Sequence, residues 1–223
     1  MRSSELNAWW AWVSATAMFL ARLLFKIHVE GVANVPAEGP AILAFNHVSV
    51  LDGPVLAIEV ARRRRRESRF LVASEIFDQL LAGSILRSFH QIPIRRGEGD
   101  LGALEEAIRI VRRGTIAAIA PEGRVNEDPN AGLLRLHRGV ARLALPTGAP
   151  VIPVGFWGTQ ERWPKTGLRV GRPWRPRAAL VFGEPIPAHG EASEPDDIDA
   201  FTDEVRRSLQ TQVARARAIA EAR

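Results

Sequence analysis

The chain has 223 residues, of which 30 are basic, 25 are acidic and 46% are hydrophobic, and its formal net charge is +5. This length and apolar content suit one globular domain with a sizeable core. Cysteine is absent, which excludes disulfides, thiolate nucleophiles and cysteine zinc sites. Nearly all the basic residues are arginine, whose planar fork suits phosphate and carboxylate groups, so nucleic acid, anionic lipid and phosphorylated metabolites are all admissible partners.

An uncharged apolar segment lies near the amino terminus, at residues 8–21. It is shorter than the roughly 18 residues that a membrane-spanning helix needs. Trp9, Trp10 and Trp12 crowd its beginning, and indole rings favour the boundary between lipid headgroups and acyl chains. We therefore predict a helix that lies in or dips into one leaflet of a membrane, with a core helix and a secretory signal peptide as the alternatives.

Beyond this segment, apolar runs of strand length alternate with segments of helical periodicity. The expected strands are residues 26–31, 41–45, 69–73, 91–95, 115–120, 151–156 and a late strand and turn within 177–188, and the expected helices are 75–88, 101–113, 133–145 and 196–223. Such alternation is typical of an α/β domain in which helices flank a mostly parallel sheet. Ligands of such sheets sit beyond the carboxyl ends of the strands, so motifs that directly follow a strand are the first candidates for a site.

Five consecutive arginines, residues 62–66, close a predicted helix. Cations at this position complement the helix dipole and are typically solvated. Docking to anionic lipid or to an acidic carrier protein is the alternative interpretation. The pattern alone does not choose between the two.

The most informative short stretch is Asn-His-Val-Ser-Val-Leu-Asp, residues 46–52, which directly follows a predicted strand. Ser49 with Asp52 three residues later fits a capping box, the pattern of a helix start. Pro54 favours a later start, because proline is tolerated only in the first positions of a helix. We predict a turn after the strand and a helix that begins at Asp52 or the next residue.

Such a turn would bring His47 and Asp52 together. On a regular helix, residues five apart are separated by roughly 140° of azimuth, so the two side chains meet only if the chain turns between them. An aspartate that accepts a hydrogen bond from one imidazole nitrogen fixes the tautomer and leaves the other nitrogen free as a base. The substrate would then supply the nucleophile, for example a hydroxyl group. His47 and Asp52 are therefore the candidate catalytic residues.

Three further motifs lie in or directly after predicted strands. They are Ile-Pro-Ile-Arg-Arg at 92–96, Pro-Glu-Gly at 121–123 and Ile-Pro-Val at 152–154. In order with residues 46–52, they resemble the four sequence blocks of the glycerolipid acyltransferases typified by lysophosphatidic acid acyltransferase. The resemblance covers about residues 30–185, and its first and third blocks are the most specific.

This resemblance implies an activity and assigns residues to it. His47 would be the general base, with Asp52 as its partner, for transfer of an acyl chain to the free hydroxyl of a lysophospholipid, most directly 1-acylglycerol-3-phosphate. The acyl donor would be a thioester of coenzyme A or of acyl carrier protein, with no further cofactor. The residues implied in substrate binding are Asn46, Ser49, Arg96, Glu122, Gly123 and Arg124, of which Arg96 would bind the acceptor phosphate.

The apolar amino-terminal segment and the resemblance together predict an organisation. Residues 1–26 would form the membrane-associated helix and residues 27–223 the acyltransferase domain, placing the protein at the cytoplasmic face of a membrane. A metal site is not expected, because no His, Asp or Glu spacing fits one. Nucleic acid is not an expected partner, because only the excess of arginine favours it.

The sequence departs from the family pattern in the second and third blocks. His90 stands where the second block usually has glycine, and Ala120 replaces the aromatic residue before Pro121. Residues 124–126, Arg-Val-Asn, replace Thr-Arg-Ser and so shift an arginine by one position. Either Arg124 takes over the phosphate contact, or the acceptor is another lipid such as a glycolipid or an ornithine lipid. A membrane-bound interaction protein that keeps the fold without activity is the alternative from another class.

Overall fold

One sheet of seven strands organises the part of the chain that the computed structural model describes, residues 15–16, 19, 21–95, 99–171 and 173–222. The strands are β1 (Lys26–Glu30), β2 (Ala41–Phe45), β3 (Ser68–Ala73), β4 (Ile92–Ile94), β5 (Ile116–Ile119), β6 (Val151–Trp157) and β7 (Arg177–Phe182), in the order β1-β7-β6-β2-β5-β3-β4. Every neighbouring pair is parallel except β6 and β7. The prediction of an α/β fold with a mostly parallel sheet is confirmed.

Strand β2 runs through the middle of the sheet and is buried on both faces. Ile42 and Ala44 belong to the core on one face, whereas Leu43 and Phe45 belong to the core on the other. A strand covered on both sides needs apolar residues at every position, which explains its continuous apolar sequence. The carboxyl end of this strand delivers the chain to residues 46–52.

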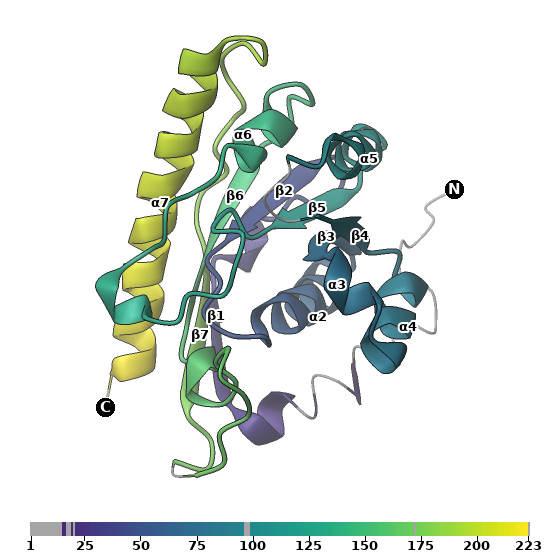
Figure 1. The fold of residues 1–223 in the computed structure, drawn as a ribbon. Helices are drawn as coiled ribbons and strands as arrows, with labels where there is room; N and C mark the ends of the chain where they lie inside the picture. The colour runs from purple at the N-terminus through teal and green to yellow at the C-terminus, as the bar shows by residue number, and fades with distance from the viewer. Residues whose placement is uncertain (1–14, 17–18, 20, 96–98, 172, 223) are drawn as a thin grey trace.

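Helices cover both faces of the sheet (Figure 1). Helix α2 (Asp52–Arg64) packs on one face, and α5 (Leu101–Arg112), α6 (Gly139–Ala144) and α7 (Pro195–Glu221) supply the core of the other. Helix α7 approaches β6 so closely that a Cβ atom at Gly155 would lie 2.2 Å from the backbone of Gln212. The remaining elements include the short helices α3 (Ser74–Phe77) and α4 (Leu80–Ser88) and the 3-10 turns η1 (Val32–Asn34), η2 (Pro129–Ala131) and η3 (Thr159–Glu161). Residues 21–24, before β1, are also helical.

Two predicted helices are wrong in extent. The helix expected over 75–88 is divided into α3 and α4, and α4 folds back so tightly that a Cβ at Gly83 would lie 2.0 Å from the carbonyl oxygen of Phe77. The helix expected over 133–145 exists only as α6. The residues before it are not helical: the His137 N–H, which a helix starting at residue 133 would direct to the Leu133 carbonyl, donates to the carbonyl oxygen of Pro121. The Leu134 N–H donates to Glu122.

The run of five arginines does not form one surface. Arg66 is only 2% exposed, and its guanidinium donates hydrogen bonds to the carbonyl oxygens of Pro36, Gly39 and Gly114. Arg63 pairs with the buried carboxylate of Glu59 at 2.6 Å. The last arginine of the run therefore fastens two loops to the end of α2, contrary to the prediction of a fully solvated or docking run.

The apolar amino-terminal segment falls largely outside the described residues. Of the helix predicted over 8–21, residues 15, 16, 19 and 21 are described, and all four are helical. In the described ranges, no helix is long and apolar enough to cross a membrane. The prediction that this segment associates with a membrane is therefore unconfirmed.

Candidate active site

The chain turns sharply between β2 and α2, as predicted from Pro54, and this turn joins two ionisable side chains. Helix α2 begins at Asp52, so residues 46–51 form the turn. The Nδ1 atom of His47 lies 3.1 Å from Oδ2 of Asp52. The spacing of five residues therefore does produce contact, because a strand end and a helix start flank it.

Asp52 is the centre of a buried hydrogen-bond network. Its side chain is completely buried, and Oδ2 also accepts hydrogen bonds from the backbone N–H groups of Val48 and Ser49, both at 2.7 Å. The bond from Ser49 is one half of a capping box, whereas the Ser49 hydroxyl accepts from Leu51 and so does not complete the box. Asp52 therefore starts the helix and holds the histidine at the same time.

The imidazole ring of His47 is fixed but accessible. It packs edge-on against the ring of Phe45, with centroids 5.9 Å apart, and its side chain is 20% exposed. Because Asp52 accepts the hydrogen bond at Nδ1, the neutral ring carries its proton there and leaves Nε2 as the basic nitrogen. Nε2 has no hydrogen-bond partner in the described ranges of the chain, so it is available to a substrate.

The Pro-Glu-Gly motif after β5 clamps the backbone of His47. Oε1 of Glu122 accepts the His47 N–H at 2.9 Å, and Oε2 accepts the N–H of Leu134 at 2.8 Å. The backbone N–H of Asn126 donates to the carbonyl oxygen of His47 at 2.6 Å. Burial raises the pKa of Glu122 above its ordinary value, and the two N–H groups that it accepts partly offset this effect. The Pro-Glu-Gly motif and the residues that follow it thus fix the position of the His47 backbone.

We expect Glu122→Gln to destabilise the protein by about 1–3 kcal/mol, because an amide can accept only one of the two backbone N–H groups and leaves the other buried without a partner. Chemical denaturation checks this value. Glu127→Gln is the matched control, since that carboxylate is exposed and pairs with Lys165 at the surface. Equal unfolding midpoints for the two variants would contradict the clamp.

Asn46 and Ser49 lie beside the pair, but their side chains contact the protein. Asn46 is buried and makes two hydrogen bonds to the backbone of Phe156, through Nδ2 at 3.1 Å and Oδ1 at 2.6 Å. The Ser49 hydroxyl donates to the carbonyl oxygen of Trp163 at 2.7 Å. Both residues therefore tie the turn of residues 46–51, which we call the catalytic turn, to β6 and the connection after it, and their expected role in substrate binding stays a prediction.

Thr159 is a member of the site that the sequence reasoning missed. Its hydroxyl donates a hydrogen bond to Oδ1 of Asp52 at 2.6 Å, and both side chains are fully buried. It follows β6 and the fourth sequence block, 107 residues from Asp52. A threonine two residues beyond a strand has no signature of its own, so only the fold could reveal this contact.

We predict that Thr159→Val lowers kcat about tenfold, the effect of losing about 1.4 kcal/mol of transition-state stabilisation, because the Asp52 carboxylate loses a charge-assisted donor. Steady-state kinetics measures this loss. Thr159→Ser keeps the hydroxyl and should restore most of the rate. If the serine variant is as slow as the valine variant, the role of the hydroxyl is wrong.

The remaining predicted residues are less closely joined to the pair. Gly123 has a φ of 70°, and a Cβ atom there would lie 3.1 Å from the ring of His137, so this position favours glycine. Arg124 is exposed, with its charge acting on Glu127. Arg96 lies outside the described residues. The expected phosphate contacts of the two arginines stay predictions.

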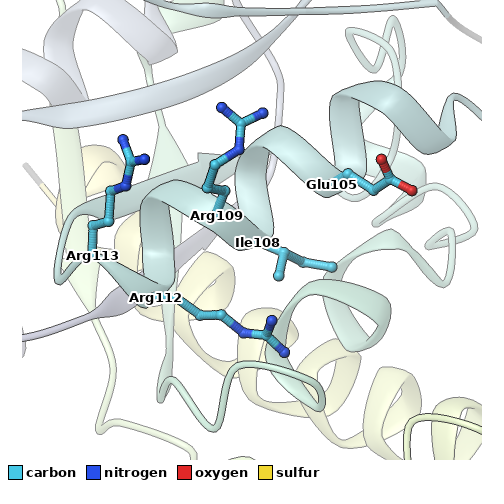
Figure 2. A pocket seen from close by; sticks show the side chains of 5 residues that line it. All are labelled: Glu105, Ile108, Arg109, Arg112 and Arg113. Carbon is cyan, nitrogen blue, oxygen red and sulfur yellow. The ribbon is translucent and has the colours of Figure 1, made fainter.

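Two cavities stand out among the described residues. One, of about 500 Å³, lies along α5 and is lined by Glu105, Ile108, Arg109, Arg112 and Arg113 (Figure 2). These arginines close a helix that leads into the start of β5, so they lie at the sheet edge opposite His47 and complement the helix dipole. The other, of about 330 Å³, borders the catalytic turn at Val48 and is lined by polar groups, including Asn126 and Gln160.

The described residues contain no group of three His, Asp or Glu side chains placed to hold a metal ion. A model of the protein family described as Acyltransferase matches residues 26–157, which is more than half of the chain. The chain belongs to this acyltransferase family.

The similar proteins include enzymes of lipid acylation. This acyltransferase is 31% identical over 193 residues to N-acylphosphatidylethanolamine synthase of Arabidopsis thaliana, covering 78% of this chain and 68% of that one. It is 27% identical over 202 residues to 1-acyl-sn-glycerol-3-phosphate acyltransferase alpha of Mus musculus, covering 86% of this chain and 65% of that one. These relatives support assigning the chain to the acyltransferase enzymes of lipid biosynthesis.

Two further comparisons bear on the fold and the length. The crystal structure of the 1-acyl-sn-glycerophosphate acyltransferase PlsC from Thermotoga maritima matches with a TM-score of 0.73 and 25% identity, covering 98% of this chain and 84% of that one. An uncharacterized protein of Mycobacterium tuberculosis is 28% identical over 235 residues. The chain spans about 63% of the length of that relative.

Proposed function

We propose that this acyltransferase moves an acyl chain from a thioester to the free hydroxyl of a lysophospholipid, with 1-acylglycerol-3-phosphate as the first candidate acceptor and phosphatidate as the product. The observation that carries the proposal is the fixed His47 and Asp52 pair, whose Nε2 is accessible beyond the end of β2. The similarity to the mouse and Thermotoga acyltransferases supports the choice of acceptor.

The proposed reaction needs no nucleophile from the protein. Nε2 of His47 takes the proton of the acceptor hydroxyl as the oxygen attacks the thioester carbonyl, and the imidazolium that forms is stabilised by the Asp52 carboxylate. Collapse of the tetrahedral intermediate breaks the carbon–sulfur bond. The imidazolium then returns the proton to the thiolate, so the products are an ester and a free thiol.

The partners follow from this reaction. The donor is a thioester of coenzyme A or acyl carrier protein, and the acceptor resides in a membrane, so we place the protein at the cytoplasmic membrane face. Arg96 and Arg124 are the proposed contacts of the acceptor phosphate, because a guanidinium binds phosphate oxygens in pairs.

An acceptor of a different kind is the second candidate. The third block has Asn126 buried, with its side chain donating to Gly132 at 2.7 Å, where the family pattern has serine, and its arginine is shifted to position 124. The Arabidopsis relative is named for acylation of phosphatidylethanolamine. An altered phosphate contact together with this relative favours testing acceptors that present an amine.

An acceptor screen with the full chain tests both candidates. One labelled acyl-CoA is supplied with 1-acylglycerol-3-phosphate, a lysoglycolipid, an ornithine lipid or phosphatidylethanolamine, and the products are read by mass. Free thiol release is followed in the same reactions. Labelled phosphatidate is the expected product. Thiol release without any acylated lipid would contradict an acyltransferase acting on these acceptors.

A further inference from the structure

The connection between β6 and β7 has an unusual composition. Residues 162–176, which we call the basic loop, contain five basic residues and no acidic residue, although the chain as a whole is nearly balanced in charge. Two tryptophans, Trp163 and Trp174, stand among these cations. Alternation of aromatic and basic residues is typical of segments that lie at a membrane interface.

The apolar side chains of the basic loop point to solvent. Val170 is 78% exposed, Trp174 74% and Leu168 55%. Large apolar side chains that cluster on a surface indicate a binding site more often than isolated ones do. Exposed cations, including Lys165, Arg169 and Arg175, flank them.

The basic loop is a built structure, because a buried arginine supports it from inside. Arg162 is only 6% exposed, and its guanidinium donates to the carbonyl oxygens of Arg169, Gly171 and Pro173. These bonds hold the backbone on the inner side of the loop. Leu168, Val170 and Trp174 are therefore presented outward by a preorganised backbone.

The basic loop is joined directly to the catalytic turn. The carbonyl oxygen of Trp163 accepts hydrogen bonds from the Ser49 hydroxyl at 2.7 Å and from the backbone N–H of Val50 at 3.2 Å. The loop also follows the carboxyl end of β6, which lies beside the carboxyl end of β2. A surface bound by this loop would therefore lie beside the turn that carries His47.

Other exposed apolar residues lie at the same edge of the sheet. Strand β1 runs opposite to β2, so Phe19 and Leu23, which precede it, lie at the edge where β2 ends. Figure 1 shows the described residues before β1 and the connection between β6 and β7 at one end of the molecule. Val50, between β2 and α2, is also exposed. The basic loop thus belongs to a broader apolar rim around the catalytic turn.

We propose that the basic loop is a docking surface for a bilayer that contains anionic phospholipid, with Leu168, Val170 and Trp174 entering the interface and Arg169 and Arg175 contacting headgroup phosphates. The inference rests on the proposed function, because a lipid acceptor reaches His47 from a bilayer. A bilayer fits better than nucleic acid or an acidic protein, because exposed aliphatic side chains gain most from a lipid environment. Docking here would set the catalytic turn at the membrane surface.

A single fluorescent label tests insertion directly. The chain has no cysteine, so Val170→Cys in the full chain gives one site for an environment-sensitive dye, and Arg113→Cys on the opposite edge is the control. On vesicles of phosphatidylcholine with phosphatidylglycerol, we expect a blue shift and quenching by nitroxide lipids at position 170 and neither at 113. The proposal is wrong if the protein binds vesicles while the label at position 170 stays hydrated. It is also wrong if the protein does not bind these vesicles.

A charge-matched pair of variants tests the role of the arginines. Arg169→Gln with Arg175→Gln should weaken binding to the same vesicles about 30-fold. Arg109→Gln with Arg113→Gln removes the same charge from the cavity of Figure 2 and should leave binding unchanged. If both double variants lose the same affinity for vesicles, binding depends on net charge alone, and the proposed docking surface is wrong.

The two proposals fail separately. Vesicle binding is read without turnover, so the docking surface stands even if 1-acylglycerol-3-phosphate is not acylated. Conversely, the labelled Val170→Cys variant should still acylate a short-chain acceptor that is dissolved as monomers, because this side chain is 78% exposed and does not line the cavity beside Val48. If the protein binds a short RNA in a salt-sensitive manner and does not bind vesicles, the proposal that a bilayer is the partner is wrong.

Discussion

His47→Ala is expected to reduce turnover by about 10²–10⁴-fold while the protein stays folded, because the variant lacks the base that accepts the hydroxyl proton. The fold should survive, since the ring lies at the surface of the core with 20% of its side chain exposed, and Asp52 keeps its three other donors. Thiol release from acyl-CoA measures the rate, and circular dichroism measures the melting temperature.

His47→Gln separates the loss of a base from the loss of shape. Glutamine can still donate to Asp52 and fill much of the same space, but it cannot accept a proton at neutral pH. Both variants should therefore be equally slow. A glutamine variant with the activity of the natural protein would mean that His47 only shapes the site, and the proposed mechanism would fail.

The strand–turn–helix frame of the site could be predicted because it depends on local sequence. The apolar run of β2 fixes a strand buried on both faces, and Pro54 restricts where α2 can start. Between these limits, only a turn remains for residues 46–51. The contact of His47 with Asp52 follows from that geometry, although the assignment of chemical roles still rests on the resemblance.

The supports of the site could not be predicted, because they come from residues far away in the sequence. The resemblance implies a role for Glu122 in substrate binding, but its contact with the His47 backbone depends on β5 lying beside β2, and Thr159 was not expected as a site residue. Likewise, Arg66 cannot be distinguished by sequence from the four arginines before it, yet it is buried. Propensity and periodicity describe neighbours along the chain, whereas these contacts depend on the strand order.

The strand order also explains why separate sequence blocks act together. Strand β2 lies between β5 and β6 with all three parallel, so the segments that follow them converge at one edge. Glu122 then reaches the His47 backbone from one side, and Thr159 reaches the Asp52 carboxylate from the other. The third block and the segment that follows the fourth block therefore hold the first block from both sides.

Asp52→Asn is expected to lower kcat by about 10²–10⁴-fold, with a destabilisation of only about 1–2 kcal/mol. Asparagine has the same shape, and its carbonyl oxygen can replace Oδ2 as the acceptor of Val48, Ser49 and His47, while its amide meets the Thr159 hydroxyl, which can accept. The turn therefore persists. The negative charge that stabilises the imidazolium is lost.

The Asp52→Asn amide could also adopt the opposite orientation, with its NH₂ group in the place of Oδ2. If the NH₂ group replaced Oδ2, two buried backbone N–H groups would lose their acceptor, at a cost of about 1–3 kcal/mol each, so this orientation is disfavoured. The rate loss must then come from charge rather than from a displaced ring. Measured kcat and unfolding free energy together decide the matter: a fully active Asp52→Asn variant would show that the His47 base needs no carboxylate, whereas an unfolded one would show that Asp52 serves mainly to start α2.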